Sequence, residues 1–183
     1  MKLKIYKNAE EAAGILARGG FEDEEVAKSV REIVRDVRER GDEALFSYCE
    51  KFDGSALDKN TLYVSEKEIQ EAYAALDEKL LSSMKKAAAN VLAYHSRNLL
   101  KEDIRTENGR TTGYTVRAVE RAGIYVPGGT APLFSSVMMG VLPAKAAGVE
   151  HIYVATPAKS CKVPPEVIAA AHLCGAEKII KAG

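Results

Sequence analysis

The chain has 183 residues, enough for one domain or two small ones, and 46% of them are hydrophobic, as in ordinary globular proteins. Its 26 basic and 26 acidic residues cancel, which argues against nucleic acid or an anionic membrane as a partner. No apolar run approaches the length of a membrane span, and the first residues lack the apolar stretch of a signal peptide. We therefore expect a cytoplasmic protein.

The first part of the chain predicts helices. Residues 9–18 indicate a short helix that ends at two glycines, and a strongly periodic helix follows Phe21. Apolar residues recur on one face of this second helix, which Gly41 ends. Asp42 then caps a third helix that stops near residues 53–54. The apolar positions of the second helix are Val26, Val30, Ile33, Val34 and Val37.

The next segment mixes helix and strand signals. Residues 61–64 are a candidate strand, and Ser65 with Glu68 has the pattern of a capping box for the helix that follows. Asp77 begins a longer helix. Asn108-Gly109 is the strongest short hairpin signal, so residues 104–119 predict two antiparallel strands around that turn.

Residues 123–157 indicate strand, glycine loop, helix and strand. Pro127 should end the first strand, because proline cannot donate a ladder hydrogen bond. Ser135 or Ser136 is expected to cap the helix, and Gly148 to follow its end. Pro143 lies inside this helix and should bend or split it. The second strand covers residues 151–156.

The end of the chain extends the same alternation. Pro165 can serve as the first residue of a helix that ends at Gly175, and residues 178–181 form a third strand. The sequence thus predicts an α/β fold. A mainly helical region with a small hairpin, residues 1–120, precedes an incomplete Rossmann-like parallel βαβαβ unit, residues 121–183, the first half of a nucleotide-binding domain. Such a unit leaves one sheet edge without a partner, so we expect a homo-oligomer.

The turn after the first strand has the composition of a ligand-binding loop. Gly128 and Gly129 follow Pro127, and two residues without Cβ let a ligand approach the backbone. Glycines at this place in a βαβ unit commonly present N–H groups to an anion such as a nucleotide phosphate. The spacing matches neither G-x-G-x-x-G nor a P-loop, and no Asp or Glu ends the second strand, so a tight βα connection without a ligand is the alternative.

Cysteines and histidines give no further site. The three cysteines are odd in number and widely separated, which fits neither a disulfide framework nor a zinc knuckle. The three histidines have no second His or carboxylate at metal-ligand spacing. We therefore assign no catalytic residue and no metal ligand to this chain, and we expect Cys174 to lie buried beside a helix end. These residues are Cys49, Cys161, Cys174, His95, His151 and His172.

Several stretches resemble the N-terminal part of the histidinol dehydrogenase family. They are VREIVRDVRERGDEALFSYCEKFDG, the pairing of Val64-Ser65 with a later Ala-Tyr-His segment, and residues 123–156 with VPGG, APLFSSV and LPAKAAGV. The resemblance implies a zinc-containing oxidoreductase of histidine biosynthesis that oxidises L-histidinol to L-histidine in two NAD-dependent steps. It implies a Glu-His pair for proton transfer, which with the zinc ligands lies downstream of the matching region.

On this resemblance we expect the chain alone to be inactive. Tyr125 matches a tyrosine that contacts NAD in the family, and Gly128 and Gly129 would line the cofactor side. A homodimer is expected, with L-histidinol as the small-molecule substrate of the complete enzyme. The alternative is a stand-alone or split-enzyme module that binds a nucleotide or another protein and has no activity of its own.

Overall fold

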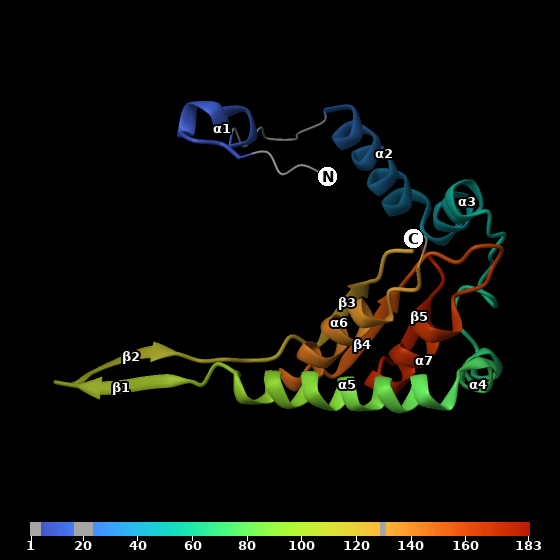
Figure 1. Ribbon diagram of the computed structural model, residues 1–183. Helices are drawn as coiled ribbons and strands as arrows, with labels where there is room; N and C mark the ends of the chain where they lie inside the picture. The colour runs from blue at the N-terminus through green and yellow to red at the C-terminus, as the bar shows by residue number, and fades with distance from the viewer. Residues whose placement is uncertain (1–4, 17–23, 129–130) are drawn as a thin grey trace. The chain divides into compact units, whose positions relative to one another are not determined.

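The computed structural model describes residues 5–16, 24–128 and 131–183 (Figure 1). The chain divides into two compact units, Met1–Gly41 and Asp42–Gly183. The elements in chain order are α1 (Ala9–Leu16), α2 (Glu24–Arg40), α3 (Asp42–Asp53), α4 (Glu66–Ala75), α5 (Glu78–Arg97), β1 (Asp103–Glu107), β2 (Arg110–Tyr114), β3 (Arg121–Tyr125), α6 (Phe134–Ala146), β4 (His151–Ala155), α7 (Pro165–Cys174) and β5 (Lys178–Ile180). The α/β fold expected from the sequence is confirmed.

The first unit contains α1 and α2. Gly41, with φ of +60°, follows α2 as predicted, because glycine adopts this backbone conformation without strain. No residue of α2 is buried in the described structure. Three apolar residues of its stripe, Val26, Val30 and Val34, are 57%, 51% and 43% exposed. The two glycines expected to end the first helix lie outside the described residues.

Local capping signals place the helices of the second unit. Ser65 Oγ accepts a hydrogen bond from the N–H of Glu68 at 3.3 Å, and Glu68 Oε2 accepts one from the N–H of Ser65 at 2.9 Å. This pair is the capping box predicted for α4. Asp77 caps α5 by accepting a hydrogen bond from the N–H of Leu80 at 3.3 Å. Both predictions are confirmed.

The strand predicted over residues 61–64 is wrong. The segment contains a turn and a single antiparallel bridge between Tyr63 and Ile180. The N–H of Val64 also donates to the carbonyl oxygen of Ile179 at 2.9 Å. Because β5 is only three residues long, it offers too short an edge for a full fourth strand. The segment nevertheless covers the outer side of β5.

The three parallel strands lie in the order β3-β4-β5. Both crossovers run in the same direction, so right-handed connections place α6 and α7 on one face of the sheet. These helices contact each other, and α5 runs along α6 (Figure 1). The main hydrophobic core joins this face of the sheet to the helices and includes Val137, Val141, Ile152, Val154 and Ile168. The parallel βαβαβ unit predicted from the sequence is present.

The helix after the glycine loop begins earlier than predicted. Its N-cap is Leu133 rather than Ser135 or Ser136, and no side chain caps it. Phe134 packs against the core, so tertiary contact outweighs the hydroxyl preference at this end. The helix runs without a break through Pro143, so of the two expected effects, a bend or a split, the split does not occur.

The structure also agrees with the remaining helix ends and the hairpin predicted from the sequence. Gly148 and Gly175, with φ of +84° and +94°, follow the ends of α6 and α7. Asn108 and Gly109 have φ of +52° and +75° and connect β1 to β2, confirming the hairpin, although β2 ends at Tyr114. Cys174 is fully buried at the end of α7, and burial raises the pKa of its thiol to about 11.

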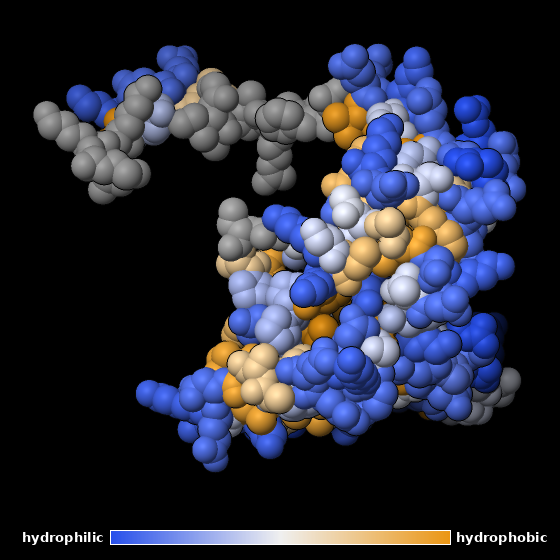
Figure 2. All heavy atoms as spheres, turned by 90° about the vertical axis from the view of Figure 1, so that its right-hand side faces the viewer, coloured by the Kyte–Doolittle hydropathy of each residue, from blue (hydrophilic) through white to orange (hydrophobic). Residues whose placement is uncertain are grey.

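Polar and charged residues cover most of the face shown in Figure 2, with smaller hydrophobic areas between them. None of the helices in the described part of the chain combines the length and apolar character needed to cross a bilayer.

Candidate functional site

A hollow of about 900 Å³ lies at the carboxyl ends of β3 and β4. Residues 127–128 line it after β3, and residues 156–157 line it after β4. The approaches to α6 and α7 and the end of α3 complete the walls. Ligands of open parallel sheets bind outside the carboxyl ends of the strands, so this position is the one expected for a ligand site.

Gly128 lies exposed on the wall of this hollow. A Cβ atom built at this position would collide with Cγ of Pro157, the residue that closes the neighbouring strand. Glycine therefore lets the two strand ends come together and keeps the wall free of a side chain. Gly129 lies outside the described residues, so its predicted role is untested.

Two helices begin near the hollow with different capacities for an anion. No side chain caps the N-terminus of α6, so its first backbone N–H groups have no side-chain acceptor. At α7 the N-cap is Pro164 and the first helical residue is Pro165, and neither has an N–H to donate. A negatively charged ligand would therefore gain more from α6.

Tyr125 is the last residue of β3 and is 59% exposed. Its neighbour Ile124 packs against the core on the α6 side. Because side chains alternate along a strand, Tyr125 lies on the opposite face of the sheet. It follows that Tyr125 lies at the same strand end as Gly128, although it is not one of the residues that line the hollow.

The charged side chains on the hollow come from two separate segments of the chain. Lys159 and Lys162 follow β4, and Asp53 ends α3. The carboxylate of Asp53 accepts a hydrogen bond from the N–H of Gly183 at 3.2 Å. The lysines were not singled out from the sequence, although basic residues just after a strand that lacks a terminal acid are a signal of an anion-binding loop.

The histidines of the described structure have local partners. His151 Nδ1 lies 2.6 Å from Glu177 Oε2, and this hydrogen bond outweighs desolvation and lowers the pKa of the Glu177 carboxyl. His172 Nδ1 lies 3.1 Å from the hydroxyl of Tyr73. Within the described ranges, no group of three His, Cys, Asp or Glu side chains could hold a metal ion. The described residues therefore do not fit a zinc ion.

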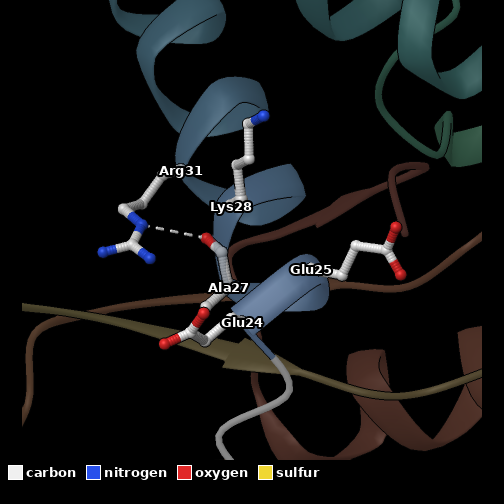
Figure 3. A pocket seen from close by; sticks show the side chains of 5 residues that line it. All are labelled: Glu24, Glu25, Ala27, Lys28 and Arg31. Atoms are coloured by element: carbon white, nitrogen blue, oxygen red, sulfur yellow. Dashed lines mark hydrogen bonds between the residues drawn. The ribbon is translucent and has the colours of Figure 1, made fainter.

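A second hollow lies on α2, in the first unit (Figure 3). Arg31 Nε donates to the carbonyl oxygen of Ala27 at 3.1 Å along one side of it. Its lining residues in the described part of the chain all come from one helix and carry charges of both signs, so these residues bring no groups together from separate elements. Its lining residues are Glu24, Glu25, Ala27, Lys28 and Arg31.

Parallel strands joined by crossover helices, with a hollow at the strand ends, define an α/β protein of the Rossmann-like class. The family model described as histidinol dehydrogenase matches residues 16–183. The chain belongs to the histidinol dehydrogenase family, as the resemblance of its sequence indicated.

Individual relatives match nearly the whole chain. The histidinol dehydrogenase of Carboxydothermus hydrogenoformans is 40% identical over 182 residues, which are 99% of this chain and 43% of the relative. That of Agrobacterium fabrum is 42% identical over 161 residues, 87% of this chain and 37% of the relative. The crystal structure of histidinol dehydrogenase from Elizabethkingia anophelis superposes with a TM-score of 0.86 at 32% identity, covering 97% of this chain and 41% of that one. The chain thus spans less than half the length of these proteins.

Proposed function

We propose that this chain is the N-terminal portion of an NAD-dependent, zinc-containing histidinol dehydrogenase that oxidises L-histidinol to L-histidine in histidine biosynthesis. The observation that carries the proposal is the family match over residues 16–183. The chain would supply the nucleotide side of the active site, in a cytoplasmic enzyme without nucleic-acid or membrane partners. Polypeptide outside this chain would supply the zinc ligands and the proton-transferring residues.

The hollow fits the nucleotide part of this proposal. It has the size of a small-molecule site and lies at the carboxyl ends of β3 and β4. Gly128 and the uncapped start of α6 would approach the phosphates, and Tyr125 at the end of β3 would contact the cofactor from the other side of the strand. We propose Gly129 as a further contact. NAD, when bound, supplies the hydride acceptor, and the residues described here bind and orient it.

Two measurements on the 183-residue chain test the proposal. We expect no NADH formation from histidinol in the presence of zinc and NAD, because the described residues do not form a zinc site. Measurable turnover would contradict this expectation. We also expect NAD to bind weakly, with a dissociation constant on the order of 0.1–1 mM, because only part of the site is present.

The NAD titration also separates this proposal from the alternative. A dissociation constant of a few micromolar or lower would favour a stand-alone nucleotide-binding module, since no further polypeptide would then be needed to complete the site. Complete absence of NAD binding at millimolar concentrations would contradict the nucleotide role of the hollow.

We also propose that the protein forms a homo-oligomer, such as a homodimer. The apolar stripe of α2 supports self-association because Val30 and Val34 are exposed hydrophobic side chains one turn apart on this helix. Sedimentation at increasing concentration tests this proposal. A purely monomeric protein at the highest concentration would contradict it.

A further inference from the structure

The loop after β4 holds two lysines opposite each other. Lys159 and Lys162 form an isolated antiparallel bridge, and the N–H of Lys162 donates to the carbonyl oxygen of Lys159 at 3.0 Å. The two residues between them, Ser160 and Cys161, have φ of +50° and +64°. Consecutive positive φ values are the geometry of a type I′ turn, which places the flanking side chains side by side.

A buried hydroxyl fixes this turn. Ser55 is 0% exposed, and its Oγ donates to the carbonyl oxygen of Ala158. The same Oγ accepts a hydrogen bond from the N–H of Cys161 at 2.9 Å. The thiol of Cys161 donates to the carbonyl oxygen of Ala56 at 3.5 Å. These contacts with a segment far away in the sequence hold the turn in a conformation that non-glycine residues rarely adopt.

The turn therefore maintains an unfavourable pair of charges. Like charges directly opposite each other on paired strands are destabilising, and an anion between them removes that cost. Both lysines are exposed on the wall of the main hollow. In the part of the chain that the structure describes, neither lysine forms a salt bridge with a carboxylate.

Neighbouring carboxylates have other partners. Lys162 also borders a smaller hollow that is lined by Glu68 and Glu71. Glu68 pairs with Lys181 at 2.6 Å, and Glu71 pairs with Lys67 at 3.7 Å. On the main hollow, Asp53 already accepts a hydrogen bond from a backbone N–H and would repel an anion. The lysines are therefore available to an external ligand, against the opposing charge of Asp53.

The position of the turn suggests the ligand chemistry. In dinucleotide-binding folds an acidic residue at the end of the second strand binds the ribose hydroxyls, whereas a basic residue there accommodates a ribose phosphate. Here residues 156–158 are Thr-Pro-Ala and the lysine turn follows directly. We propose that Lys159 and Lys162 form a phosphate subsite of the nucleotide site, which binds a phosphate group on the adenosine part of the ligand. The inference rests on the proposed function, in which the hollow binds a nucleotide.

Two adenosine nucleotides and NAD test this subsite by NMR titration of the whole chain. The probes are adenosine 5′-monophosphate and adenosine 2′,5′-bisphosphate, compared on the wild type and on a variant that combines Lys159→Ala with Lys162→Ala. We expect the variant to weaken binding of the bisphosphate by about tenfold, because it loses two charge-assisted contacts to the phosphate. Tighter wild-type binding of the bisphosphate than of the monophosphate would assign the subsite to a 2′-phosphate and would contradict NAD, which lacks that phosphate, as the ligand of the proposed function. Equal wild-type binding that is weakened for both nucleotides in the variant would assign the subsite to the 5′-phosphate.

A matched control removes the same charge elsewhere. Lys85 and Lys86 are exposed on α5 and do not line the hollow, so replacing both by alanine should change nucleotide affinity by less than about twofold. Asp53→Asn should strengthen binding of both nucleotides, because it removes the repelling charge. Equal loss of affinity in the control and in the turn variant would overturn the subsite, because it would show that removing two positive charges anywhere on the protein weakens nucleotide binding.

The outcomes also separate the subsite from the proposed function. If NAD and both nucleotides bind the wild type and the turn variant equally well, the subsite is wrong and the proposed function stands. If none of the three ligands binds the wild type at millimolar concentrations, both are wrong.

Discussion

Lys181 is a buried charged side chain, and its pairing shapes the stability of α4. Its side chain is 6% exposed, and its ammonium lies 2.6 Å from Oε1 of Glu68, which is 29% exposed. Burial alone would raise the pKa of the Glu68 carboxyl, but hydrogen bonds from Lys181 and Ser65 outweigh it and lower that pKa. The pair therefore stabilises the folded state when Glu68 is ionised.

Replacing this carboxylate should destabilise the protein in a pH-dependent way. Glu68→Gln keeps an acceptor for the capping box but leaves the Lys181 ammonium unpaired, so we expect a loss of about 1–3 kcal/mol in the free energy of unfolding at neutral pH. Because the folded-state pKa of Glu68 is lowered, its contribution is present above the unfolded-state pKa and is lost as pH falls through the folded-state pKa. Urea unfolding at neutral and acidic pH measures the difference.

An exposed ion pair on the same helix provides the control. Glu71 and Lys67 are 63% and 84% exposed, so Glu71→Gln should change stability by less than about 0.5 kcal/mol at either pH. Equal effects of the two substitutions would contradict a special role for the buried pair.

Two glycines near the candidate site offer a second comparison. A Cβ atom at Gly128 would collide with the ring of Pro157, whereas one at Gly123 in β3 meets nothing within 4 Å. Gly128→Ala should therefore cost about 1 kcal/mol of stability and weaken NAD binding severalfold, because the hollow changes shape. Gly123→Ala should leave both quantities nearly unchanged. Calorimetric titration and urea unfolding measure these effects, and identical behaviour of the two variants would count against a site at Gly128.

At the scale of elements, the hairpin of β1 and β2 is held mainly by its own pairing. All of its residues except Asp103 are exposed. Gly113 has φ of +156°, and a Cβ atom there would collide with the carbonyl oxygen of Asp103 on the opposite strand. The hairpin therefore requires glycine at this position, independently of the core.

Gly113→Ala should disrupt the hairpin without unfolding the rest of the molecule. We expect the backbone amides of β1 and β2 to lose protection from hydrogen exchange, while the global unfolding midpoint stays the same. Thr112→Ala, at the adjacent exposed position, should retain hairpin protection and serves as the control. A lowered global midpoint for Gly113→Ala would show that the hairpin contributes to the core.

Elements with a local code were predictable from the sequence. The capping box at Ser65 and Glu68 and the Asn108-Gly109 turn are specified by residues a few positions apart, and both are present. The start of α6 was not predicted, because packing of Phe134 decides it rather than the nearby serines. The strand predicted at residues 61–64 is wrong because its pairing also depends on a tertiary contact. Its partner is β5, which is only three residues long.

The candidate site was predictable only in part. The end of β3 and the place of Gly128 could be predicted, because proline restricts the backbone and glycine permits close approach to it. The lysine turn was missed, since Ser55, more than a hundred residues earlier, holds it in place. Sequence spacing alone carries no signal for such a contact.

At the scale of the whole molecule, the second unit should fold without the first. The buried hydrophobic residues of the described structure all lie between Ala44 and Ala182, and none lies on α2. Urea unfolding of a chain starting at Asp42 should therefore give the free energy of unfolding of the second unit in the complete chain to within about 0.5 kcal/mol. Loss of cooperative unfolding in the shortened chain would contradict the division into two units.

The shortened chain should also test the source of self-association. It lacks the apolar stripe of α2, so we expect sedimentation to show fewer copies per assembly than the complete chain forms. Unchanged association would place the contact on the second unit instead.

The order of the strands determines where a further strand can pair with the sheet. The outer side of β5 is covered by the bridge between Tyr63 and Ile180, whereas the outer side of β3 has no partner strand among the described residues. Any strand that joins the sheet can therefore align only beside β3. The winding direction would then reverse at β3, creating a topological switch point, and the crevice formed there would lie at the carboxyl end of β3, next to Tyr125.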